Sequence, residues 1–142
     1  AAGVAATPGA DAVARGTFDV TLTPQAPAPG EGGTGTPMGR LRIDKRFHGD
    51  LEGTSVGEML SAITATKGSA GYVALERVTA TLGGRQGTFV LQHSGVMDRG
   101  AQRLDLFVIP DSGTDGLAGL TGTMTIDRSG GGHAYVFTYR LP

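Results

Sequence analysis

The chain of 142 residues contains no cysteine, no tryptophan and no asparagine. Without cysteine it has no disulfides, no thiolate metal ligands and no thiol nucleophile. Without asparagine it has no acceptor for Asn-linked glycosylation. No apolar run approaches the roughly 20 residues that a membrane-spanning helix needs, so we expect no membrane partner.

A concentration of charge of one sign is also missing. The formal net charge is −1, and the 12 basic residues are scattered along the chain. Nucleic-acid binding requires a basic patch or stripe, so we expect no nucleic-acid partner. What is abundant is glycine: the 25 glycines lie between β-branched and aromatic runs, a distribution typical of strands joined by many short turns.

The chain length predicts a single domain with one core. Residues 1–14 (AAGVAATPGADAVA) are mostly small and lack a hydrophobic face, so we expect a flexible arm there and one barrel domain over residues 15–142. Such an arm is typical of the region after a removed signal peptide, although a trimmed chain end would look the same. We therefore expect export, with the cytoplasm as the alternative.

Alternating apolar and polar residues predict eight strand segments, at 16–23, 40–51, 55–66, 71–82, 87–95, 103–110, 117–127 and 133–141. Segment 55–66 also fits a helical period with Ser55 and Glu58 as a capping box, but Gly57 and the run 63–66 favour a strand. Residues 24–37 form a Pro/Gly-rich loop, either slack chain or a flap over a barrel mouth. The pattern predicts an all-β fold, a closed antiparallel barrel or a sandwich.

The hairpin over residues 71–95 is the most informative segment. Tyr72 and Glu76 share one mainly apolar face of its first strand, and His93 lies on the matching face of its second. A turn centred on Gly84 and Arg85 would place Glu76 directly opposite His93, with Cβ atoms ~5 Å apart. Such a pair can titrate near neutral pH, because a carboxylate favours the imidazolium while burial disfavours both charges. A structural ion pair is the alternative interpretation.

Two further polar groups lie on the strand over residues 40–51. Lys45 is on its apolar face, where we expect it to extend from the end of the sheet into solvent, a buried lumenal cation being the alternative. His48, Asp50 and Glu52 share the opposite face and could supply metal ligands. A solvated polar face is the better interpretation, so we expect no metal site.

The remaining motifs carry no chemistry that we can assign. The G-x-G-x-x-G match at 30–35 lacks the strand and helix that a dinucleotide site needs, and 111–116 lacks calcium-loop spacing. Ser94 points away from the adjacent His93, which argues against a serine hydrolase. We expect His133 to be exposed near a rim, and we expect no cofactor.

Five ordered motifs then resemble a known family. They are GDLEGTS (49–55), GSAGYVALERV (68–78), GGRQGTFVLQHSG (83–95), P-x-SGT-x-GLAGL-x-G (110–122) and H-x-Y-x-x-x-Y (133–139). From residue 40 to the C-terminus the chain resembles the DUF3224 family of uncharacterised bacterial proteins. That family is similar in fold to the allene oxide cyclase barrels, which have eight strands and a central cavity. Relatives of that shape include dirigent proteins, which orient or cyclise small apolar substrates and commonly form trimers.

The resemblance implies an allene oxide cyclase-like barrel of about eight strands and a homo-oligomer, a trimer or a dimer. It does not imply cyclase activity. Glu76, His93 and Tyr72 match the family pattern. The Pro-rich region 24–37 departs from it, as does Thr138, where relatives often carry a carboxylate.

The leading functional hypothesis is a cofactor-free cyclase, isomerase or tautomerase that acts on a small apolar molecule in the barrel lumen. Glu76 and His93 would be the acid/base pair, and Tyr72 would donate a hydrogen bond to a developing oxyanion. The residues expected to shape the pocket are Phe89, Leu91, Met97, Tyr139 and Lys45. The alternatives are a non-catalytic carrier of an apolar ligand and a structural, oligomeric barrel with a filled core.

Overall fold

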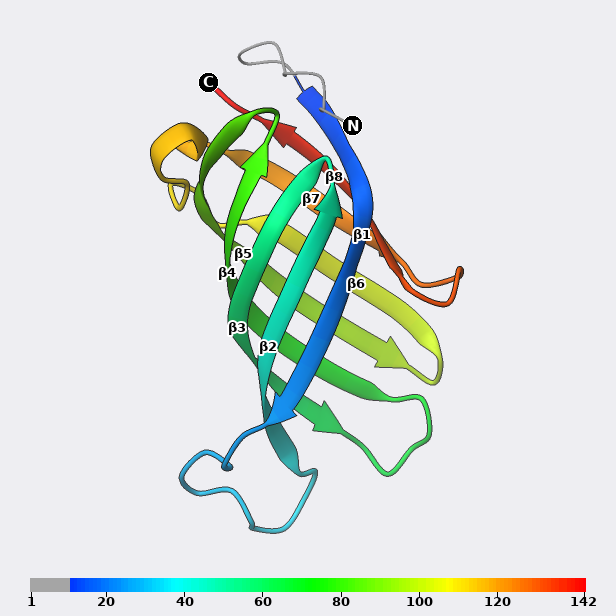
Figure 1. Ribbon diagram of the computed structural model, residues 1–142. Helices are drawn as coiled ribbons and strands as arrows, with labels where there is room; N and C mark the ends of the chain where they lie inside the picture. Colours follow the sequence, from blue (N-terminus) through cyan, green and yellow to red (C-terminus); the bar gives the residue numbers. More distant parts are fainter. Residues whose placement is uncertain (1–10) are drawn as a thin grey trace.

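The computed structural model describes residues 11–142, which form a closed antiparallel β-barrel of eight strands, as predicted (Figure 1). Each strand pairs with the next, and the last pairs with the first. The strands are β1 (Asp11–Pro24), β2 (Met38–Gly49), β3 (Leu51–Ile63), β4 (Ala70–Leu82), β5 (Arg85–Asp98), β6 (Ala101–Val108), β7 (Thr121–Asp127) and β8 (His133–Arg140). One short 3₁₀ turn, η1 (Asp115–Leu117), precedes β7. Within residues 11–142 no helix has the length and apolar character to cross a membrane.

Strand β1 begins earlier than the sequence predicted. Its first residues pair with β8, Ala12 with Tyr139 and Ala14 with Phe137, and Ala14 is buried. Ala12 and Ala14, whose small side chains suggested an arm, instead lie opposite large inward-facing aromatic rings of β8. Residues 11–14 belong to the barrel, and the rest of the predicted arm lies outside the described residues.

Segment 55–66 is a strand for most of its length, since β3 runs to Ile63. The segment predicted as a strand over 117–127 begins only at Thr121. The chain before it turns through η1 and Gly119, whose φ is +81°, and this turn directs Leu117 and Leu120 into the end of the barrel. Both leucine side chains are fully buried. Packing at the barrel end thus overrides the strand pattern.

The β4–β5 hairpin turns at Gly83 and Gly84, with Leu82 opposite Arg85. Both glycines have positive φ, +57° and +78°. A two-residue hairpin turn of this mirror-image type requires positive φ at both central positions, which glycine adopts without strain. The predicted turn centred on Gly84 and Arg85 is therefore wrong by one residue, because it would force a side-chain-bearing residue into that region.

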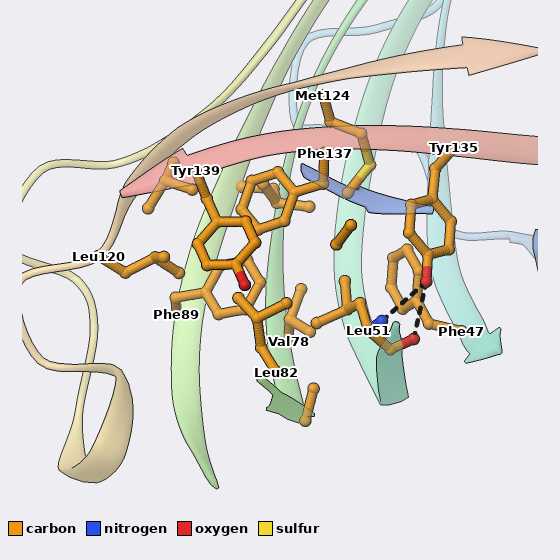
Figure 2. Packing of buried hydrophobic residues seen from close by; sticks show 14 of the residues in the cluster. Phe47, Leu51, Val78, Leu82, Phe89, Leu120, Met124, Tyr135, Phe137 and Tyr139 are labelled. Carbon is orange, nitrogen blue, oxygen red and sulfur yellow. Dashed lines mark hydrogen bonds between the residues drawn. The ribbon is translucent and has the colours of Figure 1, made fainter. Parts of the chain in front are cut away.

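One end of the barrel is packed solid. This is the end where the start of β1, the C-terminus and η1 lie in Figure 1. Figure 2 shows aromatic and aliphatic side chains from several strands meeting there across the lumen. The ring of Phe137 stacks on those of Phe89 and Tyr139, with centroids 5.9 and 5.4 Å apart. Inward-facing side chains fill small barrels in this way, so this half offers no room for a ligand.

Tyr135 fixes the tight connection between β2 and β3. Its hydroxyl accepts a hydrogen bond from the Leu51 amide at 2.9 Å and lies 3.0 Å from the carbonyl oxygens of His48 and Leu51 (Figure 2). Burial raises the pKa of Tyr135 to about 12. The phenol therefore stays protonated and satisfies backbone groups that the turn leaves unpaired.

We predict that Tyr135→Phe lowers the free energy of unfolding by about 1–3 kcal/mol, because buried backbone groups lose their partner. Tyr139→Phe is the matched control: it is the same chemical change on the same face of β8, and the Tyr139 hydroxyl makes no hydrogen bond with any residue of 11–142. We expect that variant to stay within about 0.5 kcal/mol of the parent. Urea denaturation measures both. Equal losses would contradict the role given to the Tyr135 hydroxyl.

Candidate functional site

The half of the barrel opposite the packed end contains a cavity of about 480 Å³. This is the end where the loop between β1 and β2 and the β3–β4 turn lie in Figure 1. Small-molecule sites in proteins occupy roughly 300–1,000 Å³, so the cavity has the size of a ligand site. Most of its wall is apolar, with Val20, Leu22, Leu41, Ile43, Met59, Ile63, Leu104 and Ile126 among the lining residues.

The cavity opens in part between β6 and β7. In the described chain the register of these two strands pairs only Phe107 with Thr123. Residues 101–105 of β6 are all exposed, and three of them, Gln102, Arg103 and Leu104, line the cavity together with Ile126 of β7. The barrel is therefore closed by a narrow seam near the packed end, and its strands separate where the cavity lies.

A buried ionic network forms the floor of the cavity. Lys45 of β2, Glu76 of β4 and His93 of β5 point inward and are only 8%, 1% and 4% exposed. The Lys45 ammonium lies 3.0 Å from Oε1 of Glu76, and His93 Nε2 lies 2.7 Å from the same oxygen. Ser55 donates a hydrogen bond to the other carboxylate oxygen at 2.7 Å. Glu76 thus has three donors, and none of the polar side-chain atoms buried within residues 11–142 is unpaired.

Lys45 does not extend into solvent, so that prediction is wrong and its alternative, a buried lumenal cation, holds. The carboxylate of Glu76 neutralises the ammonium, and the ring of Phe18 lies 4.6 Å below it in a cation–π contact. These two partners replace the water that a lysine would otherwise reach.

Glu76 and His93 are diagonal neighbours rather than directly opposed residues. Glu76 lies opposite Leu91, and His93 lies opposite Ala74. The shifted turn moves the register by two residues, which preserves the shared face, so the side chains still meet. On the other side of Glu76, β3 places Gly57, where a Cβ atom would collide with the Cβ of Glu76. The glycine therefore makes room for the carboxylate.

The network determines the protonation of the floor. Burial raises the pKa of Glu76, but the His93 hydrogen bond, the charges of Lys45 and His93 and the Ser55 hydrogen bond outweigh it and lower the pKa to about 2. Glu76 is therefore a carboxylate, which can only accept hydrogen bonds, so the His93 Nε2 beside it carries a hydrogen. In the neutral ring this leaves Nδ1 as the basic nitrogen. Nδ1 lies 3.4 Å from the hydroxyl oxygen of Tyr72.

Tyr72 lies beside His93 on the cavity wall. Burial raises the pKa of the Tyr72 phenol, the negative charge of Glu76 raises it further, and Arg128 opposes both effects. The phenol is therefore protonated at neutral pH and can donate a hydrogen bond to Nδ1 or to a bound molecule. This chemistry suits a donor and does not suit a general base.

His133 also belongs to the cavity wall, which the sequence analysis missed. It lies at the rim as expected, but it is half-buried, and its ring stacks on Phe18 with centroids 4.8 Å apart. Burial lowers the pKa of His133, and the positive charges of Arg128 and Lys45 lower it further. The sequence could have indicated this position, because His133 and Tyr135 are two residues apart and so share the inward face of β8.

The structure brings together some of the predicted site residues and separates others. The residues that line the cavity are Lys45, Tyr72, His93 and Met97. Glu76 lies behind Lys45 and His93 and is bonded to both. Phe89, Leu91 and Tyr139 lie in the packed half, so their predicted place in the pocket is wrong. Their face was assigned correctly, but the pattern does not say where along the barrel the packing stops.

His48 lies on the outer surface of β2. Its Nε2 is 2.9 Å from Asp19 and its Nδ1 is 3.7 Å from Glu52, all three side chains being well exposed. Within residues 11–142 no group of three or more metal-binding side chains has a suitable arrangement.

The pKa of Glu76 predicts a specific loss of stability in acid. Its folded-state value lies below the ordinary 4.5, so the carboxylate stabilises the folded state above pH 4.5, and this contribution is lost as the pH falls toward 2. We expect the loss to be on the order of 3 kcal/mol in the free energy of unfolding. The measurement is chemical denaturation across this pH range.

Glu76→Gln should remove that pH-dependent loss and cost about 3–5 kcal/mol at pH 7, because it leaves Lys45 buried without a counter-charge. The matched control is Glu58→Gln, since Glu58 pairs with Arg40 at 2.6 Å on the exposed surface. That change should cost less than about 1 kcal/mol and leave the acid profile unchanged. An unaltered profile in the Glu76 variant would show that other acids govern the transition.

The chain is similar to proteins of one known family. The model of a family described as protein of unknown function (DUF3224) matches residues 14–139. A solved structure from Shewanella oneidensis MR-1, described as a protein with unknown function from the DUF3224 family, superposes with a TM-score of 0.88. It is 51% identical, and the match covers 94% of this chain and 98% of that chain. No curated protein matches this chain. The chain belongs to the DUF3224 family of proteins of unknown function.

Proposed function

We propose that this barrel binds a small, mainly apolar molecule in the open half of its lumen and catalyses proton transfer on it. The reaction would be that of a cofactor-free isomerase, tautomerase or cyclase. One observation carries the proposal: His93 faces a cavity of about 480 Å³ while an ionised, buried Glu76 holds its Nε2 at 2.7 Å. The eight-stranded barrel with a lumenal cavity also agrees with the resemblance to allene oxide cyclase barrels.

The proposed base is Nδ1 of His93. It takes a proton from a carbon or hydroxyl group of the bound molecule, and Glu76 stabilises the imidazolium that forms. The same nitrogen then returns the proton to another position of the molecule, which is a tautomerisation or isomerisation. Glu76 has no path to the cavity except through its partners, so its role is to orient His93 and to balance its charge.

Tyr72 is the proposed donor to the oxygen of the bound molecule. Removing a proton next to a carbonyl places negative charge on that oxygen, and a positioned O–H donor stabilises the charge. The Tyr72 hydroxyl is 3.4 Å from the proposed base, so one small molecule can meet both groups. On the same floor, the Lys45 ammonium lies 3.0 Å from Glu76 and balances the charge of that carboxylate.

The wall supports an apolar substrate. Ligand sites are lined mainly by hydrophobic side chains, with a few polar groups that set orientation. Here the polar groups are concentrated at the floor and the opening, and aliphatic side chains lie between them. A carrier would need the same wall without the proton-transfer chemistry, and a wholly filled structural barrel would need the packing of Figure 2 to continue through both halves.

We further propose that the protein self-associates, as a dimer or a trimer. Its outer surface carries large apolar side chains side by side on β3 and β4, where Leu60 lies opposite Val73. Leu60, Val73 and Leu75 are 49%, 52% and 54% exposed. Contiguous exposed apolar side chains on a soluble domain are typical of an interaction surface.

The proposed base should catalyse hydrogen exchange on a bound ketone. In D₂O the protein should accelerate deuterium exchange next to the carbonyl in at least one of a panel of small apolar ketones and enones, followed by NMR. His93→Gln should reduce the rate by roughly 10²–10⁴-fold, because it removes the base. His48→Gln is the matched control, since it changes a histidine on the outer surface. Binding without any exchange would favour the carrier, and equal rates in both variants would exclude His93 as the base.

Self-association through β3 and β4 should be visible in the mass of the protein in solution. Light scattering on the eluting protein should give twice or three times the monomer mass at micromolar concentration. Val73→Lys should shift the mass to that of the monomer, because it places a charge within the apolar surface. Thr79→Lys, on the same outer face of β4, is the control. A monomeric parent protein would contradict the proposed assembly.

A further inference from the structure

The charged residues that line the cavity are all basic. They are Lys45, Arg103 and Arg128, and two histidines, His93 and His133, lie among them. No aspartate or glutamate of residues 11–142 lines this cavity. The whole chain has a net charge of −1, so the positive sign belongs to the cavity rather than to the protein as a whole.

Arg103 and Arg128 carry the positive charge of the cavity that no buried carboxylate neutralises. At the floor, Lys45 and Glu76 neutralise each other at 3.0 Å. Arg103 and Arg128 lie at the opening, on β6 and directly after β7, and neither makes an ion pair with any residue in the described part of the chain. The uncompensated positive charge is therefore at the mouth, beside the seam where the strands separate.

The charge of Arg128 acts on both walls of the cavity. It lowers the pKa of His133 on β8, and on β4 it opposes the rise in the pKa of Tyr72. Side chains from well-separated strands therefore experience its positive potential. A charge at the mouth of a cleft acts over a longer distance than one on a flat surface, because the low-dielectric walls of the cleft focus its field.

We propose that the molecule bound in this cavity is an amphiphilic organic anion. Its apolar body lies against the aliphatic wall with the reactive carbon toward His93, and its carboxylate lies at the mouth beside Arg103 and Arg128. The mouth suits the anion better than the floor, because the floor is neutral and dry whereas the mouth is positive and partly hydrated. This inference names the ligand class of the function proposed above and rests on it.

Three naphthalene probes of nearly equal shape test the charge of the ligand. They are 2-naphthoate, 2-naphthalenemethanol and 2-naphthylmethylammonium, measured by calorimetry at pH 7.5 and low salt. We expect naphthoate to bind most tightly and the ammonium least. Arg128→Gln should weaken naphthoate binding by about tenfold and leave the alcohol unchanged, because a unit charge is lost at the mouth. Arg77→Gln, on the exposed outer face of β4, is the matched control and should change neither.

The outcomes separate the two proposals. If the alcohol or the ammonium binds as tightly as naphthoate, the anion inference is wrong while the apolar ligand site stands. If the Arg128 and Arg77 variants weaken naphthoate equally, the effect is one of general charge, and the mouth has no special role. If none of the probes binds, the proposed function fails and the ligand class with it. Arg128 is exposed, so its replacement should leave the melting temperature unchanged, and a thermal scan verifies this.

Discussion

A buried carboxylate organises this barrel. Glu76 cannot be inside an all-β core unless each of its oxygens has a donor, and it takes those donors from three different strands: Lys45, Ser55 and His93. The network lies on four neighbouring strands, β2 to β5, between the packed half and the open half of the lumen. Behind it aromatic rings pack against one another, and in front of it lies the cavity with its mainly apolar wall. The cavity therefore begins where the partners of this one ionised group face the lumen.

Burying Lys45 and Glu76 costs desolvation free energy, which a purely apolar core would avoid. Buried ion pairs are often matched or exceeded in stability by apolar residues of similar volume. A barrel that needed only to fold could have leucine or methionine at the positions of Lys45 and Glu76. The packing around Phe47 and Val78 would then extend into the half that now holds the cavity. Retaining two charges and an imidazole beside a cavity therefore favours a chemical role for the floor over a purely structural one.

The sequence predicts the faces of the strands better than positions along them. Alternation alone places Tyr72, Glu76 and His93 on one inward face, because an even hairpin loop preserves the face whichever residues form the turn. It does not give the register, which depends on Gly83 and Gly84 adopting positive φ together. Nor does it show that Phe89 packs while Met97 lines a cavity, since both have the same alternation. That difference arises only when eight strands of unequal length close around one axis.

The seam between β6 and β7 unites the remaining features. An incompletely paired strand edge exposes backbone donors and acceptors, and proteins commonly protect such edges with charged side chains. Arg103 and Arg128 meet that need, yet edge protection alone would be satisfied by side chains that point into solvent. These two also line the cavity, and the charge of Arg128 acts on its walls. The opening between β6 and β7 thus weakens barrel closure and also gives access to His93. The two arginines beside it protect the strand edge and make the access route positively charged.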